Sequence, residues 1–355
     1  MKKILQNKII VITGGTGSLG KVLTHRILSG YAGTPKKIII FSRDEAKQHF
    51  MRLEYLNRQG ATDEVIYNNF KQLLEFRIGD VRDYHSVCGV LKEADIVINA
   101  AALKQVPTCE YFPFEAVQTN IVGPENIIRA IRENRLNVET VVGVSTDKAC
   151  KPVNVMGMTK ALQERIFINA NLTIPSTRFI CVRYGNVLAS RGSVIPLFLQ
   201  QIKSGGPITI TTKEMTRFLL PLEWAVDIVL NAISEASPGE MYIPKVPSAR
   251  IMDIAKVMIE DKPIKIKITG IRPGEKIHEI LVSEEEAWRT YPRGKYYVIK
   301  PILPELWTKK ESRKALNKEY SSASSLMTKK EVKKLLTTNQ LMFGQLNKIE
   351  GELLK

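Results

Sequence analysis

Short runs of apolar, mostly β-branched residues recur along the first half of the chain. Ile9–Ile12 contains no polar residue, which is typical of a parallel strand buried on both faces. A glycine-rich stretch at 13–20 follows, and a helical pattern then continues to Leu28. Further runs that predict strands lie at 36–41, 76–80, 96–99, 140–144 and 179–182.

Amphipathic patterns fill the gaps between these runs, for example at 117–133 and 159–170. Strands that alternate with helices form right-handed βαβ units, which place parallel strands in one sheet between two helical layers. We therefore predict an α/β fold with a Rossmann-type, doubly wound parallel sheet.

The regular alternation ends near residue 185, beyond which glycines and prolines punctuate shorter elements. We expect a smaller C-terminal lobe over the carboxyl ends of the strands, where doubly wound sheets bind ligands. The predicted units are a Rossmann domain at 1–185, to which later segments can return, a substrate-binding lobe at 186–320 and a basic helical tail at 321–355. The helix of the tail is expected at about 329–353.

The composition is that of an ordinary globular protein, with 44% apolar and 25% charged residues in 355. No apolar run reaches the roughly 18 to 20 residues that a membrane span needs, and the N-terminus lacks a signal-peptide pattern. We therefore expect a cytoplasmic protein without a membrane span. Four cysteines and four histidines lie without metal-ligand spacing, so we predict neither a disulfide framework nor a metal site.

The net charge of +16 suits a negatively charged partner, such as nucleic acid, an anionic membrane surface or a phosphorylated small molecule. Much of the excess lies late in the chain, for example at Lys329–Lys334, where a glutamate interrupts the lysines. No aromatic RNA-binding signature or recognition-helix motif accompanies it. We interpret this region as a solvated helix face and expect no nucleic-acid partner.

The glycine-rich stretch has the spacing G-x-x-G-x-x-G, follows a predicted strand and opens a predicted helix. In this context glycines form a tight turn and let the backbone approach a pyrophosphate, which the helix N-terminus favours. We therefore expect a dinucleotide cofactor. The expected contacts in this stretch are Gly14, Thr16, Gly17, Ser18, Leu19 and Gly20.

The end of the second predicted strand distinguishes NADP from NAD. An acidic residue there binds the adenosine ribose hydroxyls, whereas Ser42 and Arg43 can hold a 2′-phosphate. We therefore expect NADP, and NAD is the less favoured alternative because Asp44 can compete for the same role.

Two segments in the middle of the chain resemble the active site of a short-chain dehydrogenase/reductase. They are Thr146–Lys148 and the stretch that contains Met156 and Lys160. Most such enzymes have, four residues before the lysine, a tyrosine that removes the proton of an alcohol. Met156 stands there instead, and a thioether has no ionisable proton. Asp147 and Lys148 are the available alternatives for proton transfer.

Over nearly its whole length the chain resembles the UDP-N-acetylglucosamine 4,6-dehydratases of the extended short-chain dehydrogenase/reductase superfamily. These enzymes start pseudaminic acid, bacillosamine and capsular deoxy-sugar pathways. The resemblance implies a UDP-sugar substrate and a homo-oligomer, either a dimer or a hexamer. The matching stretches are TGGTGSLG at Thr13, FSRDEAKQ at Phe41, GDVRD at Gly79, NAAALKQVP at Asn99, STDKA at Ser145, VRYGNVLASRGSVIPLF at Val182, EMTRF at Glu214 and RPGEKIHE at Arg272.

The resemblance also implies a reaction. NADP⁺ takes a hydride from C4 of the sugar, the resulting ketone acidifies the C5 proton, the C6 hydroxyl leaves as water, and the hydride returns to C6. Asp147 is then the acid that protonates the leaving hydroxyl, and Lys148 is the base at C5. Thr146 bonds the 4-oxygen, and Lys160 holds the nicotinamide ribose. Because Met156 cannot act as a base, the first proton passes to Lys148 or to a water held by Thr146.

Further residues are assigned to the two ligands by the same resemblance. Arginine suits a diphosphate because its planar group makes paired hydrogen bonds, and a carboxylate suits ribose hydroxyls. We expect His278 to be structural and to lie on a helix. The remaining cofactor contacts are Asp80, Val81, Ala100, Ala101 and Ala102, and the nucleotide-sugar contacts are Lys104, Asn186, Arg191, Ser193, Val194, Arg217, Arg272 and Glu275.

Two alternatives remain open at this point. A 5-epimerase that acts on a UDP-4-keto-6-deoxy sugar needs only proton chemistry at C5, which Lys148 could supply. A catalytically idle NADP-binding protein is supported by Met156 alone, and the intact Asp147-Lys148 pair argues against it. The configuration of the product at C5, the base of the nucleotide and the final glycan also stay open.

Overall fold

The computed structural model describes residues 3–56, 64–188, 193–307 and 314–344, and its largest element is a nine-stranded sheet. Neighbouring strands from β3 to β10 run parallel, and β15 and β14 form an antiparallel hairpin at the far edge. The predicted α/β fold with a doubly wound sheet is confirmed. In spatial order the strands are β14 (Thr290–Arg293), β15 (Tyr296–Ile299), β10 (Met241–Pro244), β6 (Arg178–Tyr184), β5 (Thr140–Thr146), β4 (Ile96–Asn99), β1 (Ile9–Thr13), β2 (Lys37–Ser42) and β3 (Leu74–Ile78).

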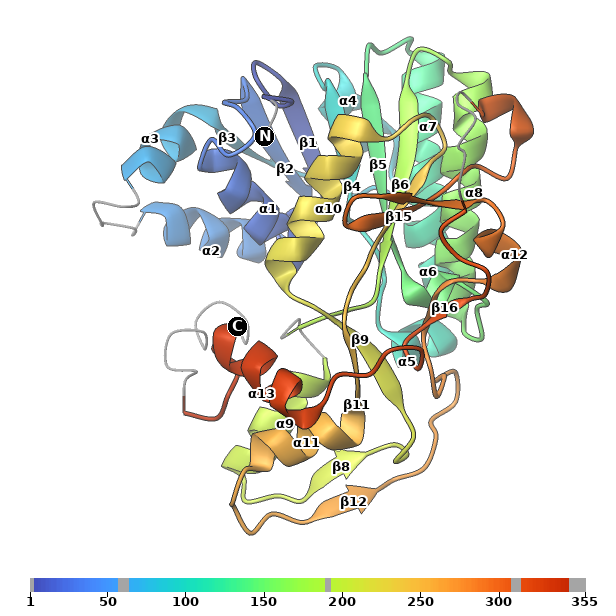
Figure 1. The fold of residues 1–355 in the computed structure, drawn as a ribbon. Helices are drawn as coiled ribbons and strands as arrows, with labels where there is room; N and C mark the ends of the chain where they lie inside the picture. The colour runs from blue at the N-terminus through green and yellow to red at the C-terminus, as the bar shows by residue number, and fades with distance from the viewer. Residues whose placement is uncertain (1–2, 57–63, 189–192, 308–313, 345–355) are drawn as a thin grey trace.

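Helices cover both faces of the sheet (Figure 1). On one face α1 contacts α3 and α10, and on the other α7 contacts α4 and α8. Every residue of β1 is buried between these layers, as its uninterrupted apolar run predicts. The covering helices are α1 (Ser18–Leu28), α2 (Glu45–Leu56), α3 (Glu64–Leu73), α4 (Tyr84–Leu91), α7 (Gly123–Glu133), α8 (Val155–Thr173) and α10 (Leu222–Glu235).

The register of the strands brings the active segments to one edge. Thr13 pairs with Asn99 at the ends of β1 and β4, and Thr146 pairs with Tyr184 at the ends of β5 and β6. Since these strands are parallel, the residues that follow them emerge at the same carboxyl edge. The glycine turn and the segment after β5 therefore face one crevice.

The third strand begins and ends two residues earlier than expected. We predicted it at 76–80, but β3 spans Leu74–Ile78. Gly79 lies against the ring of Phe41, since a Cβ there would come within 2.3 Å of a ring carbon. The Asp80 carboxylate accepts a hydrogen bond from the Arg82 amide at 3.0 Å, so the chain already turns here.

The helix predicted at 117–133 is three consecutive helical segments. The middle one is a π-helix, and α7 starts directly after it with Pro124 near its beginning. Proline has no amide hydrogen, so it cannot donate the regular bond to the preceding turn, and the ladder widens locally. The segments are α6 (Pro113–Val117), η2 (Gln118–Val122) and α7, and the short helix α5 (Val106–Tyr111) precedes them.

A smaller lobe lies beyond the carboxyl edge of the sheet (Figure 1). Its core is a separate cluster of apolar side chains from α9, α11 and α13 with strands β8 and β9. Its elements are β7 (Asn186–Val187), α9 (Val194–Lys203), β8 (Ile208–Ile210), β9 (Thr216–Leu220), β11 (Ser248–Arg250), α11 (Ile251–Ile259), β12 (Ile266–Ile268) and α13 (Lys329–Thr338). The remaining elements are η3 (Asp147–Ala149), β13 (Ile280–Val282), α12 (Glu284–Ala287), η4 (Pro304–Leu306) and β16 (Tyr320–Ser321).

The basic helix of the tail is shorter than predicted. α13 ends at Thr338, and Asn339 to Gly344 form turns, while 345–355 lie outside the described residues. Val332 and Leu336 on α13 are fully buried in the lobe, and the helix packs on α11 of the same chain. Among the described residues, no helix is both long and apolar enough to cross a membrane.

Candidate active site

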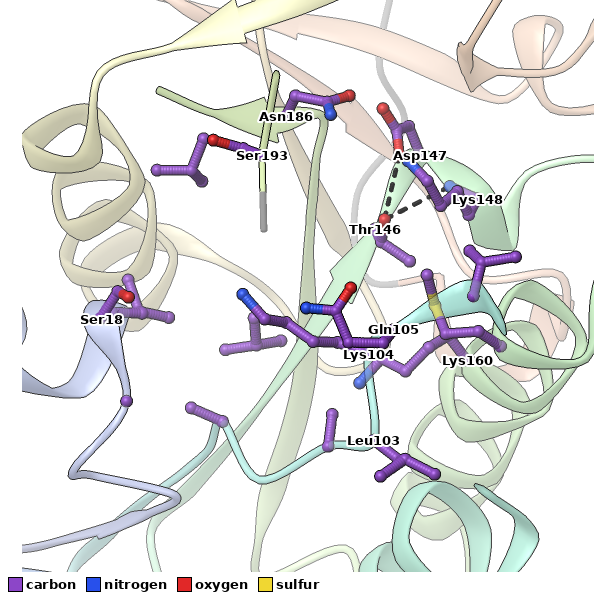
Figure 2. A pocket seen from close by; sticks show the side chains of 18 of the residues that line it. Ser18, Leu103, Lys104, Gln105, Thr146, Asp147, Lys148, Lys160, Asn186 and Ser193 are labelled. Carbon is purple, nitrogen blue, oxygen red and sulfur yellow. Dashed lines mark hydrogen bonds and ion pairs between the residues drawn. The ribbon is translucent and has the colours of Figure 1, made fainter. Parts of the chain in front are cut away.

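One cavity of about 880 Å³ lies between the carboxyl edge of the sheet and the smaller lobe. Figure 2 shows how side chains from both parts converge on it. Every predicted site residue that the structure describes lines this cavity, from the glycine turn to Glu275. Arg191 lies outside the described residues. The volume falls within the range of binding pockets for small ligands.

The glycine turn fits a dinucleotide pyrophosphate. Gly14 has a φ of +63°, and a Cβ there would come within 2.8 Å of the Ala101 backbone. At Gly20 a Cβ would come within 2.3 Å of the Gly15 carbonyl oxygen. Gly17 caps α1 without a side-chain hydrogen bond, so no side chain of the cap competes for the first amides of that helix. Small residues thus keep the turn close to β4, and the helix N-terminus favours an anion.

The region after β2 contains two cations and one engaged anion. Ser42 Oγ lies 3.0 Å from Thr16 Oγ1, and Arg43 Nη1 lies 3.6 Å from Asp80 Oδ2. Hydrogen bonds from Lys47 hold the pKa of Asp44 below its usual range, so this carboxylate is already paired. Lys47 also lines the cavity, which sequence reasoning missed. Arg43 and Lys47 thus place two positive charges beside the cavity.

Three consecutive residues at the end of β5 form the centre of the site. Thr146 Oγ1 donates to Asp147 Oδ1 at 3.0 Å and accepts from the Lys148 amide at 3.4 Å (Figure 2). Lys148 Nζ donates to the same Asp147 oxygen at 3.0 Å. Asp147 is fully buried, and its Oδ2 has no hydrogen-bond partner among the described residues. Burial raises the pKa of the Asp147 carboxyl, which favours its protonated form.

The start of helix α8 forms the next part of the site. Asn154 caps it by accepting a hydrogen bond from the Gly157 amide at 2.7 Å, and donates to the Gly274 carbonyl at 2.7 Å. The cap therefore ties the start of α8 to the lobe. Met156 is buried in a small apolar cluster with Cys109 and borders the cavity.

Lys160 lies one turn beyond Met156 on α8 and is buried. Its Nζ donates to Gln163 Oε1 at 2.6 Å. Burial lowers the pKa of Lys160 to about 8, since little else in the site compensates its charge. A lysine with this pKa is mostly cationic at neutral pH. A further hydrogen-bond acceptor, such as a ribose hydroxyl, would stabilise the buried ammonium group.

Glu279 is the functional candidate that sequence reasoning missed. It lies directly before β13, is 2% exposed and borders the cavity. Its Oε1 lies 3.2 Å from Lys148 Nζ and 3.7 Å from Arg217 Nε. Burial acts to raise the pKa of Glu279, but the charges of Lys148 and Arg217 outweigh it, so the pKa is lowered. The stretch RPGEKIHE contains this glutamate, but no local spacing connects it with Lys148.

Lys148 consequently has two carboxylate neighbours. Burial acts to lower the pKa of Lys148, but the charges of Asp147 and Glu279 outweigh it, and the pKa is raised. The resting lysine is therefore an ammonium group. A base at this position must first transfer a proton to another group.

Most of the predicted sugar-nucleotide residues that the structure describes lie on the lobe side of the cavity. Arg217 is buried and donates to the carbonyls of Thr216 and Ile277, at 2.7 and 3.1 Å. Glu275 Oε2 accepts from Thr211 Oγ1 at 3.3 Å. In the described part of the chain, Asn186 Oδ1 and Ser193 Oγ are buried without hydrogen-bond partners. Such atoms suit the polar groups of a ligand. Val194 and Arg272 complete this wall, whereas Lys104 lines the cavity from the segment between β4 and α5 of the main sheet.

His278 does not lie on a helix, contrary to expectation. It lies in a bend before β13, where Thr216 Oγ1 approaches its Nδ1 at 2.8 Å, so its contact is structural. Burial raises the pKa of the Cys150 thiol to about 12, which keeps it from acting as a nucleophile at neutral pH. The described residues contain no cluster of acidic, histidine or cysteine side chains that could bind a metal.

Comparison with known proteins extends the likeness across most of the chain. A family model described as "Polysaccharide biosynthesis protein" matches residues 10–301. A protein of Rickettsia typhi named UDP-glucose 4-epimerase is 43% identical over 343 residues, which cover 94% of this chain and 96% of that protein. A Rickettsia bellii protein with the same name is 43% identical over 341 residues, which cover 93% of this chain and 95% of that protein.

Two solved structures are also similar. Pen from Bacillus thuringiensis has a TM-score of 0.85 and 34% sequence identity, and the match covers 95% of this chain and 99% of that one. The dTDP-glucose 4,6-dehydratase DesIV from Streptomyces venezuelae, solved with NAD, has a TM-score of 0.65 at 17% identity. That match covers 76% of this chain and 86% of DesIV, and it shows a common fold alone.

Proposed function

This chain belongs to the polysaccharide biosynthesis protein family of extended short-chain dehydrogenases/reductases, and from that premise we propose that it is a nucleotide-sugar 4,6-dehydratase. The proposed substrate is UDP-N-acetylglucosamine and the product a UDP-4-keto-6-deoxy-N-acetylhexosamine. The observation that supports this most is the buried Asp147 carboxyl beside the Lys148 ammonium, 3.0 Å apart. Removal of the C6 hydroxyl requires an acid close to a base: Asp147 supplies the acid, and Lys148 supplies the base once its ammonium group has released a proton.

NADP, bound along the glycine turn and beside Arg43 and Lys47, would supply the hydride acceptor for C4 and the hydride for C6. Lys160 would hold its ribose. Asp147 would donate a proton from Oδ2, the oxygen without a protein partner in the described structure, to the leaving C6 hydroxyl. Lys148 would exchange the proton at C5, and Thr146 would orient the 4-oxygen.

Incubation with UDP-N-acetylglucosamine in heavy water, followed by mass spectrometry and proton NMR, tests this proposal. We expect loss of one water without net consumption of cofactor, and deuterium at C5. Lys148→Ala should abolish turnover, whereas Asp147→Asn should slow loss of the hydroxyl more than it weakens binding. Lys151→Ala is the matched control, because Lys151 pairs with Glu319 outside the cavity at 3.2 Å. An unchanged sugar with a fully loaded cofactor would contradict the proposal and favour either a 5-epimerase or an idle NADP-binding protein.

An epimerase is the second candidate, and two observations favour it. The Rickettsia relatives bear the name UDP-glucose 4-epimerase, and Met156 removes the usual base for oxidation of an alcohol. A 4-epimerase would return an isomer that keeps its C6 hydroxyl. A 5-epimerase would leave UDP-N-acetylglucosamine untouched but exchange C5 of the 4-keto-6-deoxy sugar. The mass and the position of deuterium therefore separate all three activities.

A further inference from the structure

Glu279 reaches the catalytic centre from a distant part of the chain and is fixed there by its backbone. Its amide donates to Ser322 Oγ at 2.9 Å, and its carbonyl accepts from the Ser322 amide at 2.8 Å. Ser322 directly follows β16, which pairs with β13. Two neighbouring strands thus hold the Glu279 side chain at the wall of the cavity. Rigid support of this kind suits a group whose position matters for chemistry.

The two carboxylates beside Lys148, those of Asp147 and Glu279, have different surroundings. Its Nζ lies 3.0 Å from Asp147 Oδ1 and 3.2 Å from Glu279 Oε1. Glu279 has a second cation in Arg217 at 3.7 Å, whereas Asp147 is fully buried and its other polar contact is the Thr146 hydroxyl. Two carboxylates that share one ammonium do not both ionise readily, and the one with more cationic neighbours keeps its charge.

We propose that Glu279 is a positioning residue: in the resting site its carboxylate forms the ion pair with the Lys148 ammonium, which leaves Asp147 protonated as the acid, and during turnover it takes one proton from that ammonium across the 3.2 Å contact. This inference rests on the proposed roles of Asp147 and Lys148. The unpartnered and buried Oε2 of Glu279 leaves an oxygen without a competing protein donor in the described structure.

The proton transfers balance over one turnover. An N–H bond of the Lys148 ammonium breaks and an O–H bond forms on Glu279, so the free amine can take the C5 proton. The Asp147 O–H bond and the C6–O bond break as water leaves and the C5–C6 double bond forms. Lys148 later returns a proton to C5 and recovers its own from Glu279. On oxidation of C4 the 4-hydroxyl proton passes through a water held by Thr146 to solvent, and solvent returns one proton to Asp147 after the C6 hydroxyl has left as water.

Exchange of the C5 proton in heavy water isolates the step that needs Glu279. The probe is the UDP-4-keto-6-deoxy-N-acetylhexosamine, which needs no hydride transfer to exchange. Glu279→Gln should slow exchange by about 10²-fold or more, as loss of proton-transfer assistance typically does, while KM stays within about threefold of wild type. Glu279→Asp should recover part of the rate. Glu319→Gln, which removes a carboxylate beside Lys151 outside the cavity, is the matched control.

The pH profile separates this role from simple support of the fold. Loss of the Glu279 charge lowers the pKa of Lys148, but the ammonium must then release its proton to solvent instead of to a carboxylate 3.2 Å away. Raising the pH from about 7 to about 9.5 should therefore restore much of the exchange rate of Glu279→Gln, because lysine deprotonates in that direction. The other charged groups that face Lys148, namely Asp147, Arg217 and Lys276, stay unchanged in the variant.

Wild-type exchange in Glu279→Gln at neutral pH, or a loss that alkaline pH does not relieve, would overturn the inference. If Glu279→Gln does not fold, the C5 exchange rate and its pH profile are measured on Glu279→Asp instead. A wild-type rate with a wild-type pH profile in that variant would overturn the inference. Failure of the proposed dehydration is a distinct result. In that case the wild type would exchange C5 of the keto sugar without removing water from UDP-N-acetylglucosamine, and the Glu279 variants would still test the relay.

Discussion

Met156 occupies the place of a catalytic tyrosine, and its surroundings resemble those of a core residue. Its side chain is buried beside Cys109 and Ala116 while one part of it borders the cavity. A thioether can shape the cavity and exclude water from it, but it cannot move a proton. We therefore expect the proton chemistry of the site to depend on Asp147, Lys148 and Glu279.

Met156→Ala should reduce kcat by about tenfold or less, because the change removes packing and no acid or base. Lys148→Ala should cost roughly 10² to 10⁴, the usual effect of losing a general base. Steady-state kinetics with UDP-N-acetylglucosamine measures both. A large loss on Met156→Ala, with the melting temperature retained, would show that the thioether has a direct role.

Arg43 should decide between NADP and NAD. Its guanidinium lines the cavity 3.6 Å from the Asp80 carboxylate, and its planar group suits a 2′-phosphate. Arg43→Ala should weaken NADP binding about tenfold or more, as loss of a charge-assisted contact does, and should change NAD binding much less. Chromatography of the nucleotide released from the denatured wild type should yield mainly NADP. Release of mainly NAD would contradict this assignment.

Lys160 should make cofactor binding depend on pH. A lysine is cationic below its pKa, and the pKa of Lys160 is about 8 because of burial. NADP affinity should therefore fall as the pH rises from about 7 to about 9.5, as the ammonium is lost. Lys160→Arg should flatten this dependence, since arginine stays charged over that range. Fluorescence titration with NADPH at several pH values checks it, and an unchanged slope in the variant would contradict the role of Lys160.

At the scale of elements, the positions of the strands could be predicted from the sequence, whereas the exact ends of several helices and strands could not. Buried β-branched runs such as Ile9–Ile12 have few alternatives to a central strand. The π-helix at Gln118–Val122 depends on Pro124, whose missing amide changes the hydrogen bonds of the turn before it. The ion pair between Lys148 and Glu279 joins two segments far apart in the chain. Periodicity describes neighbours along an element, so it has no information on such a contact.

Gly185, directly after β6, should be intolerant of a side chain. A Cβ there would lie 2.7 Å from Phe218 Cβ and 3.0 Å from Asp147 Oδ2. Gly185→Ala should displace the acid and reduce kcat by roughly 10²-fold, as small misplacements of catalytic groups can. Gly89→Ala on α4 is the control, because a Cβ there meets no atom within 4 Å. Equal kcat values in the two variants would contradict this packing argument.

At the scale of the whole molecule, exposed apolar side chains lie on or next to α5, α6 and α8, which contact one another, and we treat these side chains as a patch. Large apolar side chains that gather on a surface commonly mark an interface. We therefore expect a homo-oligomer that buries this patch, which is defined by Tyr111, Phe112, Phe114, Met158 and Leu162.

Light scattering at micromolar concentration should show a dimer or a hexamer for the wild type. The double change Met158→Glu and Leu162→Glu should shift it toward monomer, because two buried carboxylates without partners are costly. Ile302→Glu is the control, since Ile302 is 50% exposed and does not belong to the patch. A monomeric wild type would contradict the expectation.

The far edge of the sheet has a consequence for how the protein is made. β10, β15 and β14 complete the sheet beside β6, but they come from residues 241–299. During synthesis, the first 185 residues leave the ribosome with the backbone groups of β6 unpaired along one side. An open apolar edge of this kind pairs readily with other chains. Expression of residues 1–185 alone should therefore give aggregates. We also expect the nascent chain to bind chaperones most strongly until about residue 300 has emerged from the ribosome.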